Sequence, residues 1–229
     1  MNAQQIHAHR AVLAGIASLV LLASVGRAQS ASMQGQPPIT ASDRAAMAKA
    51  KADSANRPYT KPDIDFMRGM IAHHAQALVM AGWAQSHGAG PSVQTLCNRI
   101  INAQKDEINI MQTWLRDRGQ PAPEAKPVPM KMTMGGMEHE MLMPGMLTDA
   151  QLKQLDAARG PEFDALFLRL MIQHHRGAVS MVEDLLTHDG AAQDELVFKL
   201  TNDIHVDQST EIARMQRMLT QIAVGRSAP

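Results

Sequence analysis

Met70-Ile71-Ala72-His73-His74 is the stretch that decides the fold, because it returns 101 residues later as Met171-Ile172-Gln173-His174-His175. Further matches flank it at the same offset, and a second set recurs at an offset of 104 residues. Two copies of a helix pair predict an all-α fold, a four-helix bundle. The matches are Asp63 with Asp164, Phe66 with Phe167, Arg68 with Arg169, Ala77 with Ala178 and Met80 with Met181, then Gln104, Glu107, Ile108, Met111, Gln112 and Leu115 with Gln208, Glu211, Ile212, Met215, Gln216 and Leu219.

The composition agrees with a helical core. Aromatic residues are only 3% of the chain, whereas 18 residues are methionine, so aliphatic and thioether side chains must fill the interior. We expect repeat one at residues 60–119, a long Met-rich crossover at 120–147 and repeat two at 148–222. Proline and glycine place the helices at about 60–87, 91–118, 149–159, 161–189 and 192–222.

The N-terminal residues have a different character. An apolar run after Arg10 ends in Gly26-Arg27-Ala28, which predicts a signal peptide at residues 1–28 that is cleaved near Ala28. A mobile leader with one loose helix is expected at 29–59. The mature protein is therefore predicted to be periplasmic or secreted, with no stable membrane anchor. The single cysteine, Cys97, lies in an apolar helical segment and is interpreted as a buried, inert thiol.

The repeated histidines are the first candidate site. A helix turns about 100° per residue, so each phrase places one thioether and two imidazoles within reach of one centre. The candidate metal ligands are Met70, His73, His74, Met171, His174 and His175. Gln104, Glu107, Gln208 and Glu211 are candidate supporting residues, because each glutamine interrupts an apolar stripe and a buried amide or carboxylate is costly unless it is paired. A purely structural hydrogen-bond network is the alternative, and the pattern leaves open which histidine of each pair faces inward.

The crossover is the second candidate site. Between residues 130 and 146 it carries seven methionines and one histidine: Met130, Met132, Met134, Met137, His139, Met141, Met143 and Met146. A thioether is a soft, neutral ligand that suits Cu(I), with Ag(I) as its mimic. Thioethers do not titrate, so metal on the crossover should survive acidification to about pH 5. Metal on the histidines should be released there unless burial lowers their pKa. The alternative is a linker whose methionines are accidental.

These motifs carry a resemblance that extends from about Lys61 to Leu219. The doubled pattern Asp-x-x-Phe-x-x-x-Met-x-x-His-His, with Met143-Pro144-Gly145-Met146 between its copies, resembles domain-of-unknown-function family 305. That family comprises ferritin-like helical bundles of the bacterial cell envelope, some of them associated with copper binding and copper tolerance. The resemblance implies a ferritin-like bundle and a role with copper.

Three functions follow from these features. The main hypothesis is an exported Cu(I)-binding protein that sequesters or passes on copper, with other envelope copper-handling proteins as partners. The alternatives are a ferritin-like metalloenzyme with an oxidoreductase activity and a structural helical module. An enzyme is the weaker hypothesis, because di-iron bundles carry Glu-x-x-His on two helices and this chain does not. The formal charge of zero gives no case for nucleic acid.

Overall fold

A computed structural model describes residues 40–55, 58–134 and 137–225, with only the backbone described for residues 50, 51, 54, 55, 130–134 and 137–140. The predicted signal peptide lies outside the described residues. The helices are α1 (Ala41–Ala55), α2 (Lys61–Gly82), α3 (Pro91–Asp117), α4 (Asp149–Ala157), α5 (Gly160–Leu186) and α6 (Glu195–Ala223); the strands are β1 (Met130–Met134) and β2 (Met137–Met141).

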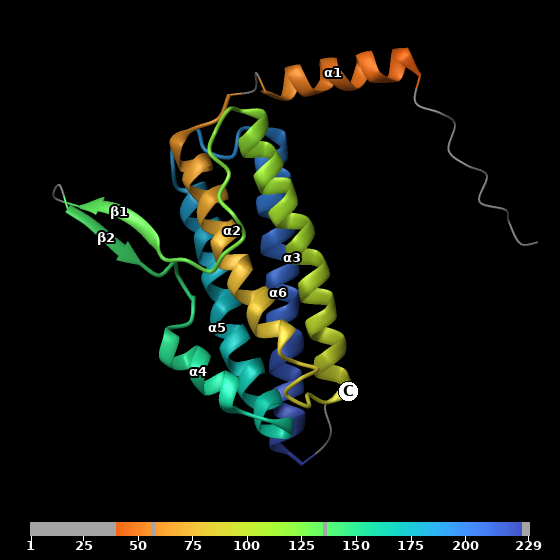
Figure 1. Ribbon diagram of the computed structural model, residues 1–229, viewed down its shortest axis with the longest axis vertical. Coiled ribbons are helices and arrows are strands. Elements are labelled where there is room, and N and C mark those ends of the chain that lie inside the picture. The colour runs from red at the N-terminus through yellow and green to blue at the C-terminus, as the bar shows by residue number, and fades with distance from the viewer. Residues whose placement is uncertain (1–39, 56–57, 135–136, 226–229) are drawn as a thin grey trace, which may run out of the picture. The chain divides into compact units, whose positions relative to one another are not determined.

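The four long helices α2, α3, α5 and α6 lie side by side (Figure 1). Each repeat forms one antiparallel pair, since α2 packs along α3 and α5 packs along α6, while α2 also contacts α5 across the two repeats. The predicted all-helical, four-helix class is therefore confirmed, with the chain crossing over between α3 and α5. Within the described residues, no helix is long and apolar enough to span a membrane.

Two aspartates tie the repeats together at the helix starts. Asp63 forms a capping box with Thr60, and its Oδ1 also accepts the Ala192 backbone N–H at 2.8 Å. Asp164, its counterpart in repeat two, accepts the Gly90 backbone N–H at 3.1 Å. Each acid thus bonds the interhelical loop of the other repeat, which explains why both are retained in the repeat as structural residues.

The core consists of two main hydrophobic clusters. One surrounds Phe163, Phe167 and Met171, and the other surrounds Met70 and Trp114. Both methionines are fully buried and pack among apolar side chains. The structure therefore gives Met70 and Met171 a packing role, and their role as metal ligands stays a prediction.

The crossover contains a hairpin that the sequence analysis did not predict. β1 and β2 pair antiparallel, with Met130 opposite Met141 and Met134 opposite Met137. The signal was present, because polar and methionine residues alternate on both sides of Gly135-Gly136 in the sequence, as in a two-residue β-hairpin.

The end of α2 also differs from the prediction. The helix ends at Gly82 instead of His87, and the chain continues in turns. The physical reason is a set of tertiary contacts of His87. Its backbone carbonyl accepts the Gly160 N–H at 2.8 Å, and its side-chain Nε2 lies 3.0 Å from the Asp156 carboxylate. These contacts with the chain at α4 and the start of α5 replace the last helical turn.

Candidate metal centre

Both histidines of each pair are buried in the middle of the bundle, with no exposed surface. Neighbouring residues on a helix point about 100° apart, so each pair serves two different neighbours. His73 on α2 lies against His174 on α5, with ring centroids 3.8 Å apart. His74 instead faces α3, and His175 faces α6. One member of each pair therefore contacts the other repeat, and the second contacts its own partner helix.

Hydrogen bonds fix the orientation of three of the four rings. The Nε2 atoms of His74 and His175 each lie 2.7 Å from a carboxylate oxygen, of Glu107 and Glu211 respectively. His73 Nε2 lies 3.0 Å from the Pro144 carbonyl oxygen. Because these oxygens accept, each Nε2 must carry the proton and donate it. In the neutral ring, Nδ1 is then left with its lone pair.

These Nδ1 atoms have no partner among the described residues. The same holds for both ring nitrogens of His174, for the whole side-chain amide of Gln104 and for Oε1 of Gln208. A buried polar atom without a hydrogen bond costs about 1–3 kcal/mol, so buried atoms of this kind are normally satisfied by ordered water, an ion or a ligand. Glu107 and Glu211 contact histidines, as a supporting residue would, whereas Gln104 makes no hydrogen bond.

Burial keeps two of the imidazoles neutral. Loss of solvation, aided by the neighbouring His74, lowers the pKa of His73 to about 3. Burial followed by the nearby His73 also lowers the pKa of His174 well below its usual value. A neutral imidazole is the form that binds metal. Acidification to about pH 5 therefore leaves His73 neutral, and the simple release of metal expected for unperturbed histidines does not apply to it.

The buried end of the crossover lies against this centre. Met143 and Met146 are 6% and 5% exposed and form a small cluster with Ala72, the residue before His73, with Met181 of α5 packed against it. Gln76 holds this segment by donating to the Leu147 carbonyl at 3.0 Å and accepting the Leu147 N–H at 2.7 Å. Two of the predicted thioether ligands thus lie next to the histidine helices.

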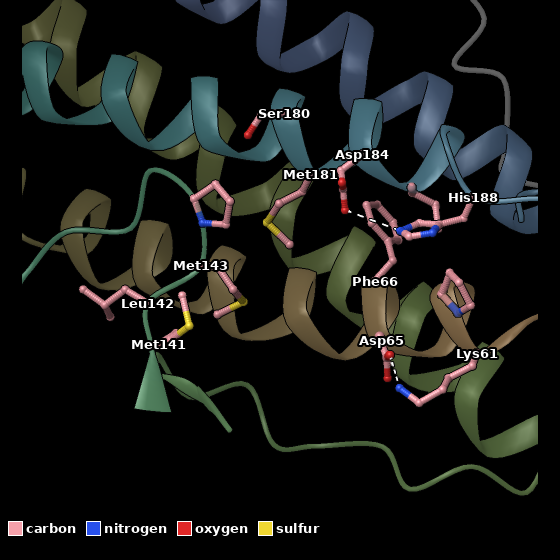
Figure 2. Close-up of a pocket in the computed structure, with 13 residues that line it drawn as sticks. Lys61, Asp65, Phe66, Met141, Leu142, Met143, Ser180, Met181, Asp184 and His188 are labelled. Atoms are coloured by element: carbon pink, nitrogen blue, oxygen red, sulfur yellow. Dashed lines mark hydrogen bonds and ion pairs between the residues drawn. The ribbon is translucent and has the colours of Figure 1, made fainter. Parts of the chain in front are cut away.

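A groove of about 760 Å³ opens beside that cluster. Its lining includes Met141, Met143 and Met181, and at one end the ion pair of Lys61 with Asp65 (Figure 2). Met141 is 48% exposed there. The sequence analysis did not single out Met181 as a donor, although its position in the repeat was visible. The placement of Met130, Met132, Met134, Met137 and His139 is described through the backbone of the hairpin.

Two further observations limit the chemistry of the site. Within the described residues, no three His, Cys, Asp or Glu side chains converge in a way that could hold a metal ion. The lone Cys97 is buried, and burial, followed by the charge of Asp164, raises the pKa of its thiol to about 12. A thiol with that pKa supplies almost no thiolate at neutral pH, which agrees with the interpretation of Cys97 as a buried thiol.

A four-helix bundle with a duplicated, buried imidazole centre is the class of protein that this fold and site define. The chain belongs to the family described as "Domain of unknown function (DUF305)", whose model matches residues 63–219. The resemblance seen in the sequence is thereby confirmed.

Several solved structures share this fold. A DUF305 protein from Streptomyces coelicolor, classed provisionally as secreted, is 28% identical with a TM-score of 0.59, over 73% of this chain and 96% of its own. A DUF305 fragment from Deinococcus radiodurans is 30% identical with a TM-score of 0.59, over 72% of this chain and 99% of its own. CopM in its Cu(II)-bound form is 31% identical with a TM-score of 0.52, over 69% of this chain and 96% of its own.

CopM has also been crystallised in Cu(I)-bound and Ag-bound forms. Among curated proteins, the uncharacterised protein L153 of Acanthamoeba polyphaga mimivirus is 36% identical over 56 residues, which are 24% of this chain and 37% of that protein. The family therefore includes at least one protein that binds copper and silver.

Proposed function

We propose that this protein binds Cu(I), with Ag(I) as a mimic, and sequesters or passes on the ion in the cell envelope. The observation that carries the proposal is the set of buried Nδ1 atoms without partners at His73, His74 and His175, each on a ring whose Nε2–H is held by an oxygen. Metal-binding histidines show this arrangement, because the bond at the far nitrogen fixes both the tautomer and the ring orientation.

The donor set favours a soft monovalent ion over Zn²⁺ or a hard cation. A structural Zn²⁺ site needs four converging ligands, and hard cations need several carboxylate or carbonyl oxygens. The described residues offer no such group of three or more. Cu(I) accepts two or three ligands and prefers thioether and imidazole, which Met143, Met146 and the histidines supply. The Cu(I)-bound and Ag-bound forms of CopM, about 30% identical, support the same choice.

The alternative of a di-iron-type oxidoreductase fits the site less well. In such bundles carboxylates bridge the metals, together with Glu-x-x-His motifs. Here Glu107 and Glu211 are the carboxylates nearest the histidines, and each already accepts a ring N–H. A purely structural centre fits less well too, since it would leave the unpaired atoms uncompensated.

The test is a competition of the metal-free protein with a chromophoric Cu(I) chelator, without oxygen. We expect one class of bound Cu(I) to lose at least tenfold in affinity in the double variants His73→Gln/His174→Gln and His74→Gln/His175→Gln. The matched control is His87→Gln, a buried histidine whose two nitrogens are both bonded, to Ser86 and Asp156. Its Cu(I) affinity should equal that of the unmodified protein. X-ray absorption at the copper edge should show nitrogen as well as sulfur neighbours.

Two outcomes would contradict the proposal. One is unchanged Cu(I) affinity and stoichiometry in both double variants while the variants remain folded by circular dichroism. The other is oxygen consumption by a tightly held metal that the chelator cannot remove, which would favour the metalloenzyme.

A further inference from the structure

The register of the β1–β2 hairpin sorts its residues by chemistry. Met130 pairs with Met141, Met132 with His139 and Met134 with Met137. Paired residues of an antiparallel ladder lie on the same face, and so do residues two apart along a strand. All five methionines and the histidine therefore share one face. The opposite face holds the other two pairs, Lys131 with Glu140 and Thr133 with Glu138.

A shift of the pairing by one residue would destroy this segregation. The sequence alone shows methionines at spacings of two, three and four, which a disordered tract would also have. The ladder adds cross-strand proximity: the Cα atoms of paired residues lie about 4.5–5.5 Å apart, and neighbouring pairs follow at about 7 Å along the strands. Methionine has three rotatable bonds beyond its backbone, so donors of both strands can reach one ion.

We propose that this face of β1–β2 is a second soft-metal site, which takes up Cu(I) or Ag(I) through thioethers from both strands and is separate from the histidine centre. It rests on the proposed function in that the same class of ion is bound. Thioethers are neutral, need no deprotonation and do not form disulfides in an oxidising compartment. A two-stranded hairpin is marginally stable in water, and an ion held across the strands would stabilise it.

The same donor chemistry continues where the hairpin ends. Met141 is the last residue of β2 and lines the groove together with Met143 and Met181 (Figure 2). Met181 packs against the cluster of Met143, Met146 and Ala72, beside His73. Thioethers thus continue from the end of the hairpin to the cluster around Ala72, the residue before His73. The hairpin is the site of capture in this arrangement, and the groove begins at its last residue, Met141.

The experiment uses the full mature chain labelled with ¹³C at the methionine methyl groups and titrated with Ag(I), a redox-stable probe. One variant exchanges donors with their neighbours: Met132→Thr, Thr133→Met, Glu138→His and His139→Glu. Its composition is unchanged, but one pair of donors moves to the opposite face. The matched control, Met132→His with His139→Met, exchanges the same two donors within their pair and keeps both on the original face.

We expect the hairpin methyl signals to shift together in the unmodified protein and the control. The face-exchanged variant should bind Ag(I) at the hairpin at least tenfold more weakly, with an unchanged helical spectrum. Equal affinity in that variant and the control would overturn the inference, because a tract without register would then suffice. Shifts confined to the bundle methionines would overturn it too, yet leave the proposed function standing. No Ag(I) or Cu(I) uptake anywhere would overturn both.

Discussion

Acidification of the metal-free protein should destabilise it well before its carboxylates protonate. The pKa of His73 is about 3 in the folded state, against an ordinary value of 6.5. Between these values the unfolded chain binds a proton that the folded chain excludes, so the free energy of unfolding falls as the pH falls. The stabilisation is complete above about pH 6.5 and is lost progressively toward pH 3. His174 acts in the same direction, because burial lowers its pKa as well.

The magnitude follows from the shift at His73. A pKa difference of one unit corresponds to about 1.4 kcal/mol, and at pH 5 the unfolded imidazole is almost fully protonated. His73 alone should then lower the free energy of unfolding by about 2 kcal/mol relative to pH 7.5, approaching about 5 kcal/mol near pH 3. Globular domains have about 5–15 kcal/mol in total, so the loss at pH 5 is readily measurable.

Urea unfolding followed by circular dichroism, with a metal chelator present, measures this loss at about pH 7.5, 6.5, 5.5 and 5. The variant His73→Gln/His174→Gln should show a much smaller dependence on pH. His188→Gln, at a half-exposed histidine that faces Asp184, should keep the dependence of the unmodified protein. A free energy of unfolding that is equal at pH 7.5 and pH 5, or a double variant with the full pH dependence, would refute the reasoning.

Two further predictions concern packing. A Cβ at Gly177 would lie 1.9 Å from the Pro144 carbonyl oxygen, so Gly177→Ala should displace the crossover, lower the free energy of unfolding by about 1–3 kcal/mol and speed proteolysis near Pro144. The control is Gly82→Ala, where no atom lies within 4 Å of the added Cβ, and its stability should be unchanged or slightly higher. Equal stability of the two variants would contradict the close approach of Pro144 to Gly177. Cys97 should not react with a chromogenic disulfide at pH 8 in the folded protein and should react at once in urea, because its thiol is buried with a pKa near 12; fast native labelling would show that the thiol is accessible.

The repeat was sufficient to predict the bundle, because two copies of an amphipathic helix pair can bury their apolar faces only against each other. It also identified the buried polar residues, since Gln104 and Gln208 interrupt otherwise apolar stripes and are 2% and 3% exposed. The tautomers and pKa values of the histidines could not be predicted. They depend on which oxygens face the rings, and one of those, the Pro144 carbonyl, belongs to the backbone of the crossover.

The positions at which the two repeats carry different residues nevertheless follow the path of the crossover. Position 72 is alanine in repeat one, and its counterpart at position 173 is glutamine. Ala72 packs against Met143 and Met146, whereas the Gln173 side-chain amide donates to the Gly145 carbonyl at 3.3 Å. One turn later Gln76 bonds Leu147 twice, and its counterpart Gly177 has no side chain because Pro144 and Gly145 pass directly over it.

A single crossover cannot contact both halves of a two-fold repeat in the same way, so residues on its path must diverge while those in the shared centre need not. His73 and His174 are the same residue in the two copies, yet only His73 bonds Pro144, and no described residue bonds the ring nitrogens of His174. The two halves of the centre are therefore chemically unequal. If the centre binds an ion as proposed, His174 and His73 should therefore not act as equivalent ligands for the first ion.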